Sequence, residues 1–439
     1  MTHSRHSAGL RRSPHVLSWL VPILAVVAVS AALAATYLGG SLNAADNISD
    51  FPIAVVNEDT GTTLPNGQSV DVGDDIEAAL LEGIDAEEFD VQQLSLAEAQ
   101  AQMENGSLYG ALVVPSGLSK DVAALAQGAR APGAVAQPAV EVLTNPRMGS
   151  FTANTVATLG REAFATANTE LGRQLQGMVQ QTQARLGAVA PLPGAATLAL
   201  TDPLEVTVTA FNPLPDGTGS GLSAFYYALI LILAGFSGSL VANAFIDSRL
   251  GFVPFEFGPR YRMESPSGFS RTRTLVAKWA VMAVIAVLVS AAYVGISAAL
   301  GMPIDRPWEL WAFGALAITG IAVVAQTINA VLGNPGLMVN LFIMVVLAIP
   351  SSGGTVPIEA TPGFFRWLAT FEPMHQIYAG ARSILYLDGS WETGLGQGVT
   401  ASIIAIVVGL VVGLAVMRLF DARGFTRGPV ARLEPAGAH

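Results

Sequence analysis

The sequence contains no cysteine, only two lysines, and few charged residues of any kind, 13% of the chain. Without cysteine, neither a disulfide nor a thiolate metal site can form, and the five histidines do not fall at metal-ligand spacing. Lys120 and Lys278 are preceded by Ser and Ala, which excludes a Gly-Lys-Ser/Thr phosphate loop and nucleotide hydrolysis through it. We see no nucleophile and base at a readable spacing, so we expect no enzyme, no cofactor and no metal.

Apolar residues make up 51% of the chain and gather into long uncharged runs. Four of these runs exceed the roughly 20 residues that cross a hydrocarbon core, a fifth (399–417) is about that long, and 336–350 is shorter. This pattern predicts a polytopic α-helical membrane protein with six transmembrane helices. The predicted helices are 16–38, 222–246, 279–300, 308–332, 336–350 and 397–417.

The acidic residues belong to one segment. Residues 39–221 carry 22 acidic and 6 basic residues, a net charge of −16, which leaves 16 basic and 11 acidic residues elsewhere, a net charge of +5. Arginines cluster in 1–15, 247–278 and 418–439, which six crossings place on the same side of the membrane. The positive-inside rule makes that side cytoplasmic, so we expect a plasma (inner) membrane protein with both termini inside, 39–221 outside and no nucleic-acid partner.

The first apolar run allows a second interpretation, because Ala32-Leu33-Ala34 has the form of a signal-peptidase site. Cleavage there would leave five crossings. We favour retention, since the run is long for a signal peptide.

The outer segment is predicted to be an α/β domain. Strands are expected at 51–57, 108–115, 140–143 and 204–211, and Ser95 with Glu98 forms a capping box that opens a helix ending at Gly106. Residues 151–189 have the spacing of a long amphipathic helix, which either packs on its own domain or contacts a second copy.

The membrane half has no ionisable residue in the core of any predicted helix, only amides. Their ordinary role is hydrogen bonding between helices, and the alternative is contact with a transported substrate. The candidate pathway residues are Asn243, Gln326, Asn329 and Asn340.

Residues 336–350 span only about 22 Å as a helix, yet the chain stays apolar beyond them. We expect 351–390 to re-enter the outer leaflet as two half-helices, 364–368 and 374–385, because unpaired backbone cannot face lipid. The candidate residues of this outer gate are Gly353, Gly354, Pro357, Pro362, Phe365, Pro373, His375 and Arg382.

The same region resembles a known family. The turn SGGTVP (352–357), the step TPGFF (361–365) and the helix PMHQIYA (373–379) follow in the order typical of the YhgE/Pip (phage infection protein) group, a branch of the type-2 ABC exporter permeases. AVVNEDTG (54–61) and AQMENGSLYGALVVPSGLSK (101–120) resemble the outer domain of that group.

The resemblance implies a permease subunit of an exporter that is powered by a separate ATP-binding subunit. An uncharged membrane half beneath an acidic outer domain suits an amphiphilic substrate better than a free anion. The resemblance also implies a homodimer or heterodimer of six-helix halves embedded in membrane lipids. The loop 247–278 would dock the ATPase through a short coupling helix in RYRMESPSGFSRTR (260–273). The candidate coupling residues are Arg260, Tyr261, Arg262, Arg271 and Arg273. The alternative function is a non-transporting envelope scaffold or receptor, or a secretion accessory protein.

Overall fold

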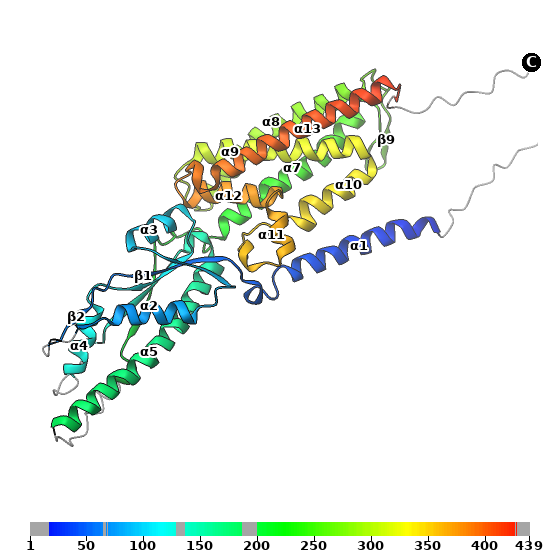
Figure 1. Ribbon diagram of the computed structural model, residues 1–439. Coiled ribbons are helices and arrows are strands. Elements are labelled where there is room, and N and C mark those ends of the chain that lie inside the picture. The colour runs from blue at the N-terminus through cyan, green and yellow to red at the C-terminus, as the bar shows by residue number, and fades with distance from the viewer. Residues whose placement is uncertain are drawn as a thin grey trace, which may run out of the picture.

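The chain forms a sheet domain at one end and a helix bundle at the other, as the computed structural model shows (Figure 1). The structure describes residues 17–64, 67, 69–128, 137–186, 200–425 and 427. The predicted inner N-terminus (1–15), residues 187–189 of the predicted amphipathic helix and the tail beyond 427 lie outside the described residues.

The sheet domain is built on a five-stranded mixed sheet with the order β4-β1-β5-β6-β7. β1 pairs in parallel with β4 and β5, β5 pairs antiparallel with β6, and β6 pairs in parallel with β7. The strands are β1 (Phe51–Asn57), β4 (Phe89–Gln93), β5 (Gly110–Val114), β6 (Ala139–Thr144) and β7 (Glu205–Ala210). The two-residue strands β2 (Thr62–Thr63) and β3 (Ser69–Val70) form a separate antiparallel pair.

Helices cover both faces of this sheet. On one face lie α2 (Val72–Gly83), α4 (Leu118–Gly128) and α5 (Ser150–Leu186), whose apolar residues share a buried core with Ile53 and Val55. On the other face, α3 (Leu96–Asn105) packs Ala99 and Met103 against Ala54 and Val56. The α/β prediction is therefore confirmed, and the apolar stripe of α5 packs on its own domain.

Local signals in this domain behave as expected. Ser95 and Glu98 form the predicted capping box, and Gly106 ends α3 in the left-handed conformation with φ of 80°. β4 was not predicted. It is an edge strand with Asp90, Gln92 and Gln93 among its five residues, and only Phe89 is fully buried, so it lacks the apolar pattern that identifies the inner strands.

The helix bundle consists mainly of long apolar helices. Among the described residues, four helices are long and apolar enough to cross a membrane: α7 (Leu222–Arg249), α8 (Arg271–Ala299), α9 (Pro307–Leu332) and the helix Trp391–Ala422, which contains α13 (Gly396–Ala422). α9 is the central helix, since it packs against α7, α8 and α13. The membrane character of the chain follows from these helices, whereas the count of six crossings stays a prediction.

Two shorter apolar helices complete this part of the chain. α10 (Asn334–Leu341) folds back on α9 after Gly333 and continues as the π-helical segment η3 (Phe342–Leu347). α1 (Leu17–Gly39) stands apart from the bundle along most of its length (Figure 1). Near its C-terminus, Thr36 Oγ1 and Tyr37 OH donate hydrogen bonds of 3.1 and 3.0 Å to the carbonyl groups of Val346 and Val345.

The predicted coupling helix is wrong. The chain between α7 and α8 instead forms an antiparallel hairpin of β8 (Phe255–Phe257) and β9 (Arg260–Arg262), with Gly258 and Pro259 as its two-residue turn. Gly258 has φ of +56°, which suits the first turn position of a tight hairpin. Pro266 and Gly268 then disfavour a helix until Ser270, whose side chain accepts a hydrogen bond from the backbone N–H of Arg273 and caps α8.

The segment 351–390 contains the two expected half-helices, α11 (Gly363–Ala369) and α12 (Pro373–Tyr386). Glu372 caps α12 by accepting hydrogen bonds from the backbone N–H groups of Met374 and His375. α12 packs against α7 and α13, so this segment lies at the end of the bundle next to the sheet domain. Its re-entry into a lipid leaflet stays a prediction.

Candidate functional site

A pocket of about 710 Å³ lies between the helices at the end of the bundle away from the sheet domain, which we call the distal end. Its walls come from α7, α8, α9, α10 and the C-terminal part of α13. Leu240, Leu275, Leu337, Leu341 and Met417 make much of its lining apolar. The volume falls within the roughly 300–1,000 Å³ typical of pockets that hold small molecules.

Three of the four candidate pathway amides, Asn243, Gln326 and Asn329, line this pocket. The fourth, Asn340, is fully buried beside it, where its Nδ2 donates to Asn329 Oδ1 at 3.0 Å and to the carbonyl of Ala325 at 2.9 Å. The structure thus brings together amides that are separated by almost 100 positions in the sequence. Their role in a substrate pathway is still a prediction.

Gln326 is the least satisfied of these amides. Its side chain is only 1% exposed, and within the described chain neither Oε1 nor Nε2 has a hydrogen-bond partner. Asn329 Nδ2 also lacks one. A buried polar group without a partner costs about 1–3 kcal/mol, so these groups are either compensated by a ligand or water or retained at a cost in stability.

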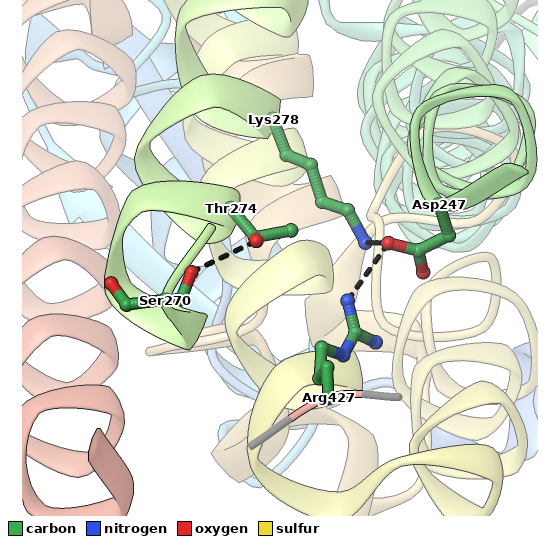
Figure 2. A network of polar contacts seen from close by, with 5 residues as sticks. All are labelled: Asp247, Ser270, Thr274, Lys278 and Arg427. Carbon is green, nitrogen blue, oxygen red and sulfur yellow. Dashed lines mark hydrogen bonds and ion pairs between the residues drawn. The ribbon is translucent and has the colours of Figure 1, made fainter. Parts of the chain in front are cut away.

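A charged cluster of Asp247, Lys278 and Arg427 lines the pocket. Figure 2 shows the side chains of Lys278 and Arg427 pointing toward the carboxylate of Asp247. Lys278 Nζ and Arg427 Nη1 both approach Oδ1 of Asp247, at 2.7 and 2.8 Å. The Lys278 side chain is 6% exposed and that of Asp247 13%. Two cations therefore share one carboxylate oxygen in a largely buried position.

The N-terminus of α8 is fixed next to this cluster. Asp421, near the end of α13, accepts hydrogen bonds from the backbone N–H groups of Arg271 and Thr272 at 2.9 and 3.0 Å. A carboxylate at this position accepts hydrogen bonds from N–H groups that have no partner within the helix, and its negative charge interacts favourably with the positive end of the helix dipole. Arg271 Nε donates to the carbonyl of Phe425 at 2.6 Å, and its side chain lines the pocket.

The candidate coupling residues divide into two groups. Arg260, Tyr261 and Arg262 lie on the exposed hairpin, where Tyr261 is 66% exposed. Arg271 and Arg273 occupy the first turn of α8, where Arg271 is half-buried and Arg273 is exposed. Arg271 thus contributes to the pocket rather than to the outer surface of the hairpin.

The candidate gate residues lie at the opposite end of the bundle. Gly353 has φ of +73°, and a Cβ on Gly354 would lie 2.3 Å from Cδ2 of Phe225 on α7. His375 Nδ1 is 3.0 Å from the carbonyl oxygen of Ser352, and the Arg382 guanidinium lies 5.2 Å from the ring centre of Tyr378. Pro357 and Phe365 are buried, whereas Pro362 and Pro373 are half-buried at the starts of α11 and α12.

Polar contacts connect the gate segment to the sheet domain. Tyr109 OH donates to Glu359 Oε2 at 2.9 Å, Arg147 Nη1 donates to the carbonyl of Tyr386 at 2.8 Å, and Asp50 pairs with Arg366 at 3.1 Å. Burial, reinforced by the charge of Glu359, raises the pKa of Tyr109 well above its usual range, so this hydroxyl stays a donor. The sheet domain and the gate segment are therefore joined by direct contacts.

Our sequence interpretation missed the charged residues of the pocket. It ended the apolar runs at Asp247 and Lys278 and assigned both to a loop, whereas α7 and α8 extend past them. It also assigned Arg427 to the tail. A possible signal was that Lys278 is the only lysine outside the sheet domain and that an acidic residue ends the preceding run.

The comparison with known proteins agrees with the resemblance in the sequence. A family model described as "Protein of unknown function (DUF3533)" matches residues 21–409, most of the chain. The chain belongs to the DUF3533 family. This DUF3533 protein is also similar to the "Uncharacterized protein YhgE" of Bacillus subtilis (strain 168), with 27% identity over 86 residues. The match covers 20% of this chain and 11% of YhgE, and together the two findings confirm the assignment to the YhgE/Pip group. No solved structure matches the chain.

Proposed function

We propose that this DUF3533 protein is the membrane permease subunit of an exporter that moves an amphiphilic substrate out of the cell, powered by a separate ATPase. The observation that carries the proposal is the distal pocket, which places polar groups inside an otherwise apolar bundle. Toward the sheet domain, α9 is packed inside the bundle, because Ala322, Ile318 and Phe313 are buried there. A polar pocket at one end of a bundle, with packed helices beyond it, is consistent with one state of an alternating-access permease.

The energy source is proposed to be separate because the sequence has no phosphate loop. The hairpin β8–β9 is a suitable docking element for it. The paired residues Phe255 and Arg262, and likewise Phe257 and Arg260, share one face of the hairpin, so that face combines exposed aromatic and basic side chains. A second six-helix half, identical or different, belongs to the same proposal.

Orientation can be tested with single cysteines, since the chain has none of its own. Ser69 in the sheet domain and Ser265 between the hairpin and α8 are both exposed. We expect a membrane-impermeant maleimide to label Ser69→Cys on intact cells, and Ser265→Cys only after the membrane is opened. Labelling of Ser265→Cys alone on intact cells would reverse the proposed orientation.

Partnership can be tested by purification in mild detergent. The wild-type protein should retain a nucleotide-binding subunit that hydrolyses ATP, and vesicles containing both should move a fluorescent phospholipid analogue only when ATP is present. Arg260→Ala combined with Arg262→Ala should reduce the amount of retained subunit roughly tenfold, because two exposed charges are lost from the docking face.

The matched control is Arg173→Ala. Its side chain is 70% exposed on α5 of the sheet domain, far from the distal end. We expect retention to be unchanged by this substitution. If the wild type retains no ATPase and the vesicles show no ATP-dependent movement, the envelope scaffold or receptor function replaces the permease.

A further inference from the structure

We propose that the distal pocket binds the negatively charged headgroup of an amphiphile, with the apolar part of the molecule lying between α7 and α10. This inference rests on the proposed function in that the bound amphiphile is the exported substrate. Beyond the proposed function, it specifies that the headgroup is negatively charged and that the apolar part lies on the α7 and α10 side of the pocket.

The charge of the pocket favours an anion. Of the residues that the structure describes, Arg271, Lys278 and Arg427 line the pocket and Asp247 is the only carboxylate among them, so this lining carries a net charge of +2. Asp421 behind the wall lowers the total to +1, and its carboxylate already accepts the N–H groups at the start of α8. Because Lys278 and Arg427 share a single oxygen of Asp247, a positive charge is left over for a headgroup (Figure 2).

The amides supply neutral donors deeper in the pocket. Within the described part of the chain, Gln326 Nε2 and Asn329 Nδ2 have no hydrogen-bond partner, and Asn329 Oδ1 accepts from Asn340, so Nδ2 is the free end of that amide. Both residues line the pocket. Phosphate or carboxylate oxygens would satisfy such donors, and a headgroup reaching both the amides and the cations would have contacts on two sides.

The walls distinguish an amphiphile from a free anion. Leu240, Leu337 and Leu341 line the pocket, and two of its apolar lining residues, Ala244 on α7 and Leu337 on α10, are exposed. In this proposal the apolar tail lies on the α7 and α10 side of the pocket, where these exposed apolar residues would meet lipid. A molecule with an apolar tail could reach the pocket along this surface without leaving the membrane.

The test uses purified full-length protein in nanodiscs and requires no ATPase. Native mass spectrometry would compare retention of phosphatidylglycerol with that of phosphatidylcholine carrying the same acyl chains, and competition by soluble glycerol 3-phosphate. We expect at least tenfold tighter retention of phosphatidylglycerol, reduced about tenfold by Gln326→Leu or by Arg271→Gln, because each loses a donor to the headgroup.

Arg423→Gln is the matched control, since Arg423 is an exposed arginine at the distal end of α13, outside the pocket lining and outside the proposed docking residues. Gln326→Leu also separates binding from folding, because removing an unpartnered amide should leave the melting temperature equal or higher. Equal retention of the two lipids would overturn the inference, and so would variants that retain as much phosphatidylglycerol as the wild type. If glycerol 3-phosphate binds as tightly as phosphatidylglycerol, the site is a free-anion site and not a lipid site.

The two proposals fail separately. ATP-dependent export by a protein that does not prefer the anionic lipid would reject the anionic headgroup and keep the permease. Selective, pocket-dependent binding without any transport would reject the permease and keep the binding site.

Discussion

Gly354→Val is expected to destabilise the folded protein strongly. A Cβ at Gly354 would lie 2.3 Å from Cδ2, 2.9 Å from Cγ and 3.0 Å from Cβ of Phe225. Phe225 is 3% exposed in the core of α7 and packs edge to face on Tyr226, so its ring cannot move away without disturbing its neighbours. Overpacking of this kind costs roughly 1–3 kcal/mol, and a branched side chain should reach or exceed the upper value.

The measurement is the thermal midpoint of the purified variants in detergent, arranged as a cycle between Gly354 and Phe225. Gly354→Ala and Phe225→Ala should each lower the midpoint, whereas the double variant should be no less stable than Phe225→Ala, because the new methyl group enters the space left by the ring. Simple additivity of the two effects would show that the clash does not occur.

Gly363→Ala is the control for this experiment. It opens α11, and a Cβ there meets no atom within 4 Å. Alanine should therefore be neutral or stabilise the helix by up to about 1 kcal/mol. A loss of stability as large as that of Gly354→Ala would mean that any side chain in this segment is harmful, independent of Phe225.

The parts of the fold that could be predicted are those where one local signal decides the structure. β1 is buried at most of its positions and lies inside the sheet, so its apolar sequence FPIAVVN identifies it. The capping box at Ser95 depends only on contacts between Ser95 and Glu98, which lie within one turn of helix. Pro362 and Pro373 each stand at the start of a helix, where the missing N–H costs nothing, and so mark α11 and α12.

The parts that could not be predicted depend on contacts between distant segments. The hairpin β8–β9 has only three residues in each strand, and its sequence does not differ clearly from that of a loop or a short helix. The pocket requires α10 to fold back on α9. Gly333 permits this through φ of 67° and ψ of −136°, and Gly336 permits it because a Cβ there would lie 2.8 Å from the carbonyl oxygen of Ile328. Amide residues were recognised by type, but their convergence follows from this reversal.

The charges of the pocket illustrate the same limit. A charged residue normally ends a membrane helix because burial of an unpaired charge is costly. Asp247 and Lys278 continue their helices because each neutralises the other, at a separation of 31 positions in the chain. Neither residue, considered alone in the sequence, indicates that it has an oppositely charged partner on another helix.

The second large effect is expected for Asp247→Asn. Without the carboxylate, Lys278 and Arg427 are left side by side with no counter-ion in contact, and the Lys278 side chain is only 6% exposed. Leaving a buried charge unpaired costs about 3–5 kcal/mol, so the thermal midpoint in detergent should fall sharply. Lys278→Met should be milder, because Asp247 keeps Arg427 as its partner at 2.8 Å.

The relative stabilities of three variants test whether a single carboxylate holds both cations. The double variant Asp247→Asn with Lys278→Met should recover much of the lost stability, because the one remaining cation, Arg427, has a side chain that is 30% exposed and can be hydrated. Arg262→Gln serves as the control, since it breaks the exposed pair of Arg262 with Glu264, a contact expected to contribute at most about 1 kcal/mol. If Lys278→Met proves more damaging than Asp247→Asn, then Arg427 does not hold the carboxylate, and the cluster is a simple pair between α7 and α8. The positive charge available to a headgroup would then have to come from Arg271 and Arg427 alone.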